Sequence, residues 1–291
     1  MDKHILLTGA GTGLGLETAL YLAKRGFTVY ASVLTVEQQE LVAAEASKRN
    51  LVVHTPLLDV TSNDSIHAAL EIILREGALY GVIHNAGISL RGYFEDCDDD
   101  EVRRVMDVNL FGVMAVTRAI LPHMRENQLG RMVFVSSIGG RIASMARTAY
   151  CASKFALEGF AESLMQEVTP LNIQVSIVEP AIIKTERWTV HRGIARRAQD
   201  PSSPYRRWFQ QQEALANKLV ETSPTRPIHV AQTVYKALTA SRPSLRYVVG
   251  KRANLVLALR RYIPGEIFER FYFGEAMRRV TAERADMRLI R

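Results

Sequence analysis

The glycine-rich segment at residues 8–15 restricts the fold of this chain more than any other feature. It contains four glycines, follows an apolar run at residues 4–7 and precedes a helical pattern at residues 14–25. Glycine permits a tight turn and lets backbone N–H groups approach a phosphate, and the N-terminus of the following helix adds a favourable partial charge. The order of strand, glycine turn and helix therefore predicts a nucleotide-binding turn.

A second pattern joins Ser137, Tyr150 and Lys154. Tyr150 and Lys154 are four residues apart, so they share one face of a helix. A free phenol has a pKa of about 10, and a cation held beside it favours the phenolate, which can act as a base. Ser137 ends a strand-like run at residues 132–137, so its hydroxyl could face the same pocket. Because the Tyr-x-x-x-Lys spacing also occurs by chance, the prediction of an acid–base site depends on the accompanying glycine turn.

Strand-like and helical segments alternate along the chain. Strands are expected near residues 3–8, 27–33, 52–58, 80–84, 131–136, 173–178 and 246–249. Helices are expected near residues 14–25, 36–48, 63–75, 99–126, 148–168 and 228–240. Near-continuous apolar strands indicate a sheet that is buried on both faces. The alternation predicts a single α/β domain with a doubly wound parallel sheet and a ligand at the carboxyl ends of its strands.

Several motifs together resemble the short-chain dehydrogenase/reductase family over roughly residues 3–250. The cofactor turn of the family matches Thr8, Gly9, Gly13 and Gly15, and the catalytic positions match Ser137, Tyr150 and Lys154. Further matches are Asp59 and Val60, Asn85-Ala86-Gly87, Asn109, and the segment 180–185. Residues 150–164 are most similar to the hydroxysteroid and retinol dehydrogenase branch.

The resemblance implies a Rossmann-fold catalytic domain over residues 1–250, with a helical substrate cap at about residues 184–226 and a C-terminal helical extension over residues 251–291. It implies an NAD(P)-dependent oxidoreductase that interconverts an alcohol and its ketone or aldehyde. The expected catalytic residues are Asn109, Ser137, Tyr150 and Lys154. The expected cofactor-binding residues are Thr8, Gly9, Gly11, Thr12, Gly13, Leu14, Gly15, Val33, Asp59, Val60, Asn85, Ala86, Gly87, Tyr150, Lys154, Pro180, Ala181, Ile183 and Thr185.

Within that family pattern, Asn109 is expected to hold a water near Lys154, and no metal ion is expected. Two positions depart from the family. His84 stands where a second asparagine is common, and we interpret it as structural. Ala181 replaces the usual glycine after Pro180, which would carry a penalty if the backbone there had a positive φ.

The end of the second expected strand bears on the choice of cofactor. An aspartate there would bind a ribose 2′-hydroxyl and repel a 2′-phosphate, but the position is Val33. The arginine that often accompanies NADP is also absent, because Leu34 follows. Ser32 and Thr35 could donate hydrogen bonds to a phosphate, so NADP(H) is favoured over NAD(H).

Charge is distributed unevenly. Residues 1–183 contain 15 Lys and Arg against 21 Asp and Glu, whereas residues 184–291 contain 22 against 9. In the predicted cap, arginines could attract an anionic substrate or its carrier, or could form a solvated surface. The residues concerned are Trp188, Tyr205, Trp208 and Phe209 with Arg192, Arg196, Arg197, Arg206 and Arg207. The acidic stretch at residues 95–101 is interpreted as a solvated loop and a helix N-terminus.

The C-terminal extension has an amphipathic, basic pattern at residues 255–273. It could pack over the substrate cleft, against a second subunit or on an anionic membrane surface, and packing is favoured over the membrane. Nucleic-acid binding is not expected, because no nucleic-acid module accompanies the charge. A homo-oligomer is expected, paired through the helices near 99–126 and 148–168, since the latter carries Phe155, Phe160, Leu164 and Met165.

Composition indicates a globular protein. The chain has 291 residues, is 47% hydrophobic and contains two cysteines, Cys97 and Cys151. This cysteine usage, with neither a signal peptide nor a spanning helix expected, predicts a cytoplasmic protein. The competing classes are a non-catalytic nucleotide-binding regulator and a membrane-surface protein that acts through its basic tail. The complete set of four catalytic residues favours an enzyme.

Overall fold

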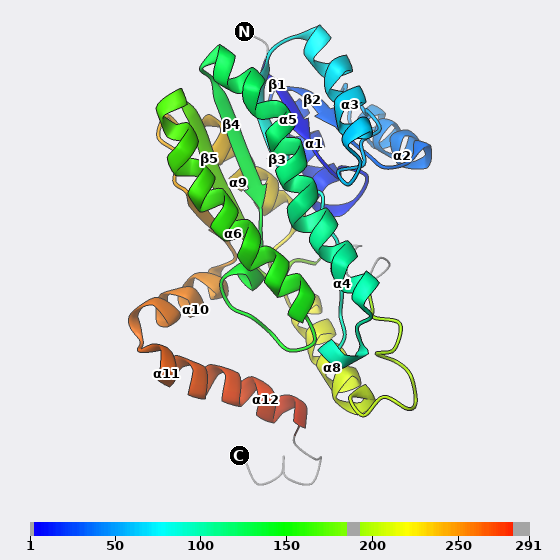
Figure 1. Cartoon of the computed structure of the whole chain (residues 1–291), viewed down its shortest axis with the longest axis vertical. Helices are drawn as coiled ribbons and strands as arrows, with labels where there is room; N and C mark the ends of the chain where they lie inside the picture. Colours follow the sequence, from blue (N-terminus) through cyan, green and yellow to red (C-terminus); the bar gives the residue numbers. More distant parts are fainter. Residues whose placement is uncertain (1–2, 185–192, 282–291) are drawn as a thin grey trace.

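The computed structural model describes residues 3–184 and 193–281. A parallel six-stranded sheet with the order β2-β1-β3-β4-β5-β6 forms its centre (Figure 1). The strands are β1 (His4–Leu7), β2 (Thr28–Ala31), β3 (Leu79–His84), β4 (Gly130–Val135), β5 (Ile173–Pro180) and β6 (Arg246–Val249). The predicted doubly wound α/β fold is therefore confirmed.

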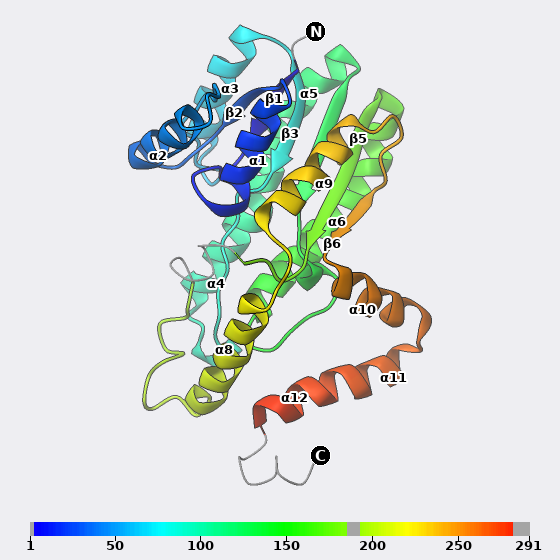
Figure 2. The same ribbon diagram turned by 180° about the vertical axis from the view of Figure 1, so that it is seen from behind.

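Helices bury both faces of this sheet (Figures 1 and 2). In β4, Met132 and Phe134 enter one core while Val133 and Val135 enter the other, because successive side chains of a strand alternate between faces. The first core is covered by α3 (Asn63–Glu76), α5 (Gly112–Asn127) and α6 (Thr148–Val168). The second is covered by α1 (Gly13–Lys24), α2 (Val36–Ser47) and α9 (Pro227–Thr239).

The strand order reverses between β1 and β3. The chain passes from β1 outward to β2 and then returns to the opposite side of β1 as β3. In open parallel sheets, ligands bind at such a reversal, beyond the carboxyl ends of the strands. The loops after β1 and β3 therefore form the centre of the expected site.

The strand predicted at residues 52–58 does not form as a strand, so this prediction is wrong. The segment does run parallel to β2, with bridges from Tyr30 to His54 and from Val33 to Leu57. The rung between these bridges needs an N–H from residue 56, and Pro56 has none. The pairing is therefore interrupted at the edge of the sheet.

One continuous helix covers residues 99–127, close to the predicted 99–126. It comprises α4 (Asp99–Met106), a π-helical segment, η2 (Asp107–Phe111), and α5. By length and composition alone it could cross a membrane, although 44% of its most apolar window is buried inside the fold. Val113, Val116 and Ile120 pack in the first core. In this structure the apolar pattern of the helix is used for packing against the sheet.

The cap lies beyond the carboxyl edge of the sheet. Its helix α8 (Arg206–Glu221) contributes Phe209 to a third apolar cluster with Leu90, Val105 and Ala146. A buried ion pair between Arg91 and Glu213, 2.5 Å apart, joins α8 to the loop after β3. The cap is thus attached to the loop that forms one side of the expected site.

A helical arm follows β6 and extends away from the sheet (Figure 2). It consists of α10 (Lys251–Tyr262), α11 (Gly265–Phe268), η5 (Glu269–Phe273) and α12 (Gly274–Thr281). Phe268 and Val280 are buried, and α12 contacts α8. Large apolar side chains remain exposed along the arm, namely Leu255, Leu259, Tyr262, Ile267, Phe271, Tyr272 and Met277.

Candidate functional site

The glycine turn between β1 and α1 depends on two close approaches. Gly9 has a φ of +69°, and a Cβ there would lie 2.7 Å from Ala86 Cα. Gly15 has ordinary helical geometry, but a Cβ there would lie 2.4 Å from the Gly9 carbonyl oxygen. Side chains at these positions would push the turn apart.

Hydrogen bonds join the glycine turn to the loop after β3. Thr8 Oγ1 accepts from the N–H groups of Asn85 and Ala86, both at 3.1 Å. The Asn85 side-chain amide donates to the carbonyl oxygens of Thr8 and Gly9 at 3.0 and 2.9 Å. The loops on the two sides of the strand reversal are therefore held at a fixed distance.

The start of α1 fits a diphosphate. Its N-cap residue, Thr12, makes no side-chain capping bond, and the first turn contains no acidic residue. Helix N-termini present unpaired N–H groups and a partial positive charge, which together favour a phosphate. Gly13, with a φ of +58° and open space where a Cβ would be, adds room beside them.

Ser137, Tyr150 and Lys154 converge beyond the carboxyl end of β4. Ser137 follows β4, and a Cβ on the neighbouring Gly139 would lie 3.4 Å from Ser137 Oγ and 3.3 Å from Tyr150 Cε1. Lys154 is only 5% exposed, and its Nζ donates a 2.9 Å hydrogen bond to the Val135 carbonyl oxygen. The three predicted residues therefore lie in one group, as their spacing suggested.

Two cations affect the ionisation of Tyr150. Burial alone would raise the pKa of its phenol, but Lys154, Arg147 and a hydrogen bond with Ser137 outweigh burial, and the pKa is lowered from 10. The Arg147 guanidinium carbon lies 4.4 Å from the ring centroid, and Lys154 Nζ lies 6.0 Å from it. The phenol is therefore closer to acid–base use at neutral pH than a free tyrosine.

Asn109 lies in the π-helical segment η2 and is fully buried. Its Oδ1 accepts from the Ile88 N–H at 2.7 Å, and its Nδ2 donates to the Ile88 carbonyl and to Ser153 Oγ, both at 2.9 Å. Both amide hydrogens are thus used within the protein, and the water that Asn109 is expected to hold stays a prediction. The side chain connects the loop after β3 to α6, next to the tyrosine and lysine.

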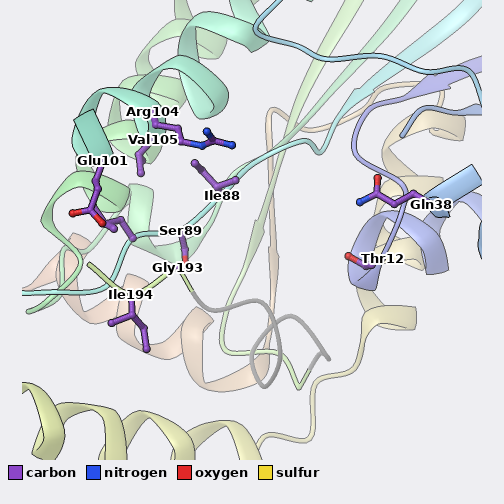
Figure 3. Close-up of a pocket in the computed structure, with 10 residues that line it drawn as sticks. Thr12, Gln38, Ile88, Ser89, Glu101, Arg104, Val105, Gly193 and Ile194 are labelled. Atoms are coloured by element: carbon purple, nitrogen blue, oxygen red, sulfur yellow. The ribbon is translucent and has the colours of Figure 1, made fainter. Parts of the chain in front are cut away.

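An open cleft of about 390 Å³ lies between the glycine turn and the loop after β3 (Figure 3). Thr12 and Gln38 line one side, and the Arg104 guanidinium points into the cleft from the other. The remaining lining includes the apolar Ile88, Leu90, Val105 and Ile194, together with Ser89, Gly193 and the acidic Glu101. The cleft combines an anion-favouring wall with an apolar one.

Several predicted cofactor residues have side chains that pack in the cores. Val33, Val60 and Ile183 are buried there, and their contact with a cofactor stays a prediction. The Ser32 hydroxyl is also fully buried, so the expectation that it meets a phosphate is wrong. Thr35 caps α2 and accepts a hydrogen bond from Gln38 N–H. Thr185 lies outside the described residues.

Asp59 and Ala181 each have an ordinary structural explanation. The Asp59 carboxylate accepts hydrogen bonds from the Thr61 N–H and hydroxyl at 2.9 and 2.7 Å. Ala181 does not have a positive φ, so the predicted penalty is absent. Its N–H donates to the Val249 carbonyl, and a Cβ on Gly250 would lie 2.8 Å from the Ala181 Cβ. The position that requires a glycine is therefore Gly250, where a Cβ would meet the Ala181 side chain, and not residue 181.

His84 is a core residue, as interpreted from the sequence. It stacks on Phe134 with ring centroids 4.7 Å apart, and its Nε2 lies 3.2 Å from Thr117 Oγ1. Burial lowers its pKa from 6.5 to about 3, so the ring is neutral throughout the physiological range.

The acidic stretch and the basic cap bind each other. Arg196 pairs with Asp98 at 2.9 Å and with Asp100 at 2.5 Å. The Ser203 hydroxyl lies within hydrogen-bond distance of both oxygens of the buried Asp96, at 2.9 and 2.8 Å. The acidic stretch does begin a helix, as predicted, with Asp98 as the N-cap of α4. Arg196 and Asp100 remain exposed but are paired with each other, which weakens Arg196 as an anion receptor. Trp188 and Arg192 lie outside the described residues.

The aromatic residues of the cap form a wall. Tyr205 stacks on Tyr93 with centroids 4.9 Å apart, and Trp208 lies 6.2 Å from Tyr93. Tyr93 and Tyr205 line a second hollow of about 450 Å³, together with Met145 and Thr148. This hollow reaches the first turn of α6, two residues before Tyr150.

Sequence reasoning missed Arg147, Arg104 and Gln38. Arg147 belongs to no recognised motif. The only sequence feature that could have indicated a role for it is its position three residues before Tyr150. Arg104 is one of many arginines on a helix, and the residues around the cleft could be identified only after the helix had been placed.

Comparisons with known proteins agree with this geometry. The family model described as short chain dehydrogenase matches residues 3–192. Human retinol dehydrogenase 5 is 32% identical over 284 residues, covering 92% of this chain and 87% of that protein. Mouse mitochondrial D-beta-hydroxybutyrate dehydrogenase is 31% identical over 287 residues, covering 93% and 83%. The crystal structure of a short-chain dehydrogenase from Streptomyces avermitilis has a TM-score of 0.77 at 29% identity and covers 95% of this chain and 99% of that one.

Gly15→Ala tests the glycine turn. The added methyl group would meet the Gly9 carbonyl, and overpacking of ~1–3 kcal/mol corresponds to roughly tenfold or more in affinity. We expect the Kd of NAD(P)H, measured by fluorescence titration, to rise by that factor. Gly159→Ala is the matched control, because Gly159 is an exposed helix position with open space at its Cβ. It should keep the parent Kd, and equal Kd values for both variants would contradict the assignment.

Proposed function

The chain belongs to the short-chain dehydrogenase family of NAD(P)-dependent oxidoreductases, which act on CH–OH groups, and we propose that it interconverts a bulky, largely apolar alcohol and its carbonyl compound. The observation that carries this proposal is the group formed by Ser137, Tyr150 and Lys154 next to the glycine turn. Its placement in the hydroxysteroid and retinol dehydrogenase branch is part of the proposal. The similarity to retinol dehydrogenase 5 supports that placement.

A nicotinamide nucleotide fits the residues at the strand reversal. The N–H groups at the start of α1 would hold its diphosphate, and Lys154 and the loop at residues 85–87 would hold the nicotinamide end. When bound, the nicotinamide supplies or accepts the hydride. The protein binds and orients the reactants, excludes water and moves a proton.

Each side chain of the group has a separate task. Ser137 donates a hydrogen bond to the substrate oxygen. In reduction, Tyr150 Oη gives its proton to that oxygen, and in oxidation the phenolate removes the proton. Lys154 stabilises the phenolate. Asn109 holds the Ile88 loop against α6, so that the substrate, tyrosine and lysine stay in register.

Tyr150→Phe tests this mechanism. It removes the proton donor and leaves the ring, so turnover should fall by about 10²–10⁴-fold, the usual contribution of general acid–base catalysis. The measurement is steady-state turnover on a panel of lipophilic ketones and alcohols, followed by nicotinamide absorbance. The Kd of the cofactor should change little, which separates lost chemistry from lost binding. Turnover within a factor of two of the parent would rule out the tyrosine as the acid–base group.

The proposed cofactor is NADP(H) rather than NAD(H). No acidic residue follows β2 directly, because Val33 and Leu34 stand there. The Thr35 hydroxyl is a donor close to the end of β2, but Glu37 competes for it, since a hydrogen bond with Thr35 lowers the pKa of that carboxyl group. The preference is therefore expected to be modest.

Titration with both reduced cofactors tests the preference. We expect NADPH to bind more tightly than NADH. Glu37→Gln should increase that ratio, because it removes a negative charge near the expected 2′-phosphate and frees the Thr35 hydroxyl. Glu40→Gln, also exposed on α2, is the control and should leave the ratio unchanged. NADH that binds tenfold more tightly than NADPH would overturn the proposal.

The proposed substrate has an apolar body and could carry an acidic end. Ile88, Leu90, Val105 and Ile194 give the cleft its apolar surface, and Arg104 provides a cation on the same wall. Arg196 is already paired with carboxylates, so the cap surface is a weaker anion site than the inner wall of the cleft. An acidic group would therefore be met by Arg104.

The proposed assembly is a homodimer through α5 and α6. Phe111 and Phe155, on adjacent segments of this helix pair, are 55% and 41% exposed. Leu164 is buried and Phe160 packs on Phe134, so these two contribute less to a contact than their sequence suggested. The arm offers a second exposed apolar surface, for which a second subunit and an anionic membrane are the competing partners.

Light scattering of matched variants tests the assembly. The parent should have at least twice the 32.6 kDa mass of one chain at micromolar concentration. Phe155→Glu should lower that mass, because it places a charge in the apolar contact. Tyr262→Glu, at a more exposed aromatic position on the arm, should not. A parent mass near that of one chain contradicts the dimer, and a response to Tyr262→Glu alone would place the contact on the arm.

A further inference from the structure

Among the residues that the structure describes, Arg147 is the cation closest to the ring of Tyr150. Its guanidinium carbon is 4.4 Å from the ring centroid, nearer than Lys154 Nζ at 6.0 Å. A guanidinium within about 6 Å of an aromatic face is attracted by the ring quadrupole, and more strongly when the phenol is ionised. We infer that Arg147 is a positioning residue for the reaction, one whose guanidinium stabilises the ionised phenol of Tyr150 together with Lys154. This inference rests on the proposed role of Tyr150.

The backbone that places Arg147 is held by the loop after β3. Arg147 is the N-cap residue of α6, and the residue before it, Ala146, has a φ of +55°. That conformation is unfavourable for alanine and persists only when its surroundings impose it. Here Gly92 N–H donates to the Ala146 carbonyl at 3.0 Å, and Gly92 also bridges to Arg147. The turn is therefore aimed by packing against the loop after β3.

No acid competes for the charge of Arg147. Within residues 3–184 and 193–281, no carboxylate forms an ion pair with it, and its Nε is buried without a hydrogen-bond partner. Arg196 is the contrasting case, since Asp98 and Asp100 hold its guanidinium. A guanidinium without a carboxylate partner keeps its full charge for the neighbouring ring, and the partial burial of Arg147 weakens the screening by water.

The other groups that face the phenol come from three places. Lys154 approaches from the next turn of α6, Ser137 from the loop after β4, and Cys151 from the next position of α6. Lys154, Arg147 and the hydrogen bond with Ser137 favour the phenolate, whereas burial and Cys151 oppose it. Lys154 also donates to the Val135 carbonyl, so its position is fixed by the sheet. Arg147 is therefore a second cation with its own attachment.

Loss of this charge should shift the pH profiles of oxidation and reduction to higher pH, which slows oxidation at neutral pH but does not slow reduction there. Without Arg147 the pKa of Tyr150 rises, so the phenolate needed for oxidation forms at higher pH and the acidic limb of that profile moves upward. The protonated phenol needed for reduction persists to higher pH, so the alkaline limb of the pH profile for reduction also moves to higher pH. At neutral pH, oxidation should fall about tenfold, the size expected for one partly desolvated cation–π contact.

The direct test is the titration of the Tyr150 phenol in the free enzyme. Tyrosinate absorbance is followed against pH, and the spectrum of Tyr150→Phe is subtracted to isolate the one residue. Arg147→Gln should titrate at higher pH than the parent, and Arg147→Lys between the two, because lysine keeps the charge but not the planar contact. Arg125→Gln, which removes an exposed arginine from α5, is the control and should titrate as the parent does.

The titration tests the role of Arg147 separately from the proposed catalytic role of Tyr150. Circular dichroism verifies folding, and if the glutamine variant unfolds, Arg147→Met, which keeps an apolar stem, replaces it. A folded neutral variant whose phenol titrates at the parent pH would overturn the inference. If Tyr150→Phe remained fully active, the proposed function would fail, but the phenol titration would still report whether Arg147 stabilises the ionised ring.

Discussion

The hydrogen bonds between Thr8 and Asn85 fix the place where a nucleotide can lie, and the rest of the site is arranged around them. They close the gap between the loops after β1 and β3, where the strand order reverses. Each bond contributes only about 0.5–1.5 kcal/mol, but a buried partner left without its bond costs more. Gly9 and Gly15 are required because the same closure brings backbone within 2.7 Å or less of any added Cβ. The nucleotide turn is therefore a product of tertiary contact as much as of local glycine content.

The catalytic helix is tied to that centre by polar contacts along its length. Near its start, Ser153 accepts a hydrogen bond from Asn109, and Lys154 donates to the Val135 carbonyl. Further along, Arg246 of β6 bonds to Glu158 at 3.1 Å and approaches the fully buried Glu179 at 3.3 Å. Burial and the neighbouring Glu179 raise the pKa of Glu158, while Arg246 opposes that rise. Since Lys154 and Glu158 are each held by a partner outside α6, rotation of the helix about its axis would break several contacts at once, which keeps Tyr150 in one orientation.

The sequence predicted the features that local pattern determines and missed those set by distant contacts. The strands, most helix boundaries and the convergence of Ser137, Tyr150 and Lys154 follow from periodicity and motif spacing. The failed strand at residues 52–58 depended on one missing N–H at Pro56, which matters only once β2 is alongside. Ser32 is a polar residue directly after β2, and only the completed sheet shows that its hydroxyl is enclosed. Arg147 was invisible because its position depends on Gly92, 55 residues earlier in the chain.

The unequal distribution of charge along the chain has a partly internal explanation. The acidic residues 95–101 and the basic cap are separated by about a hundred positions, yet Arg196 and Ser203 reach back to Asp98 and Asp96. These contacts hold the cap against the loop after β3, the same loop that aims Ala146 and Arg147 at the tyrosine. One arginine that looked available for substrate on the cap surface, Arg196, is paired with acidic residues of the same chain. Two further cations lie on the inner walls, Arg104 in the cleft and Arg147 over the phenol, where partial exclusion of water makes each charge more effective.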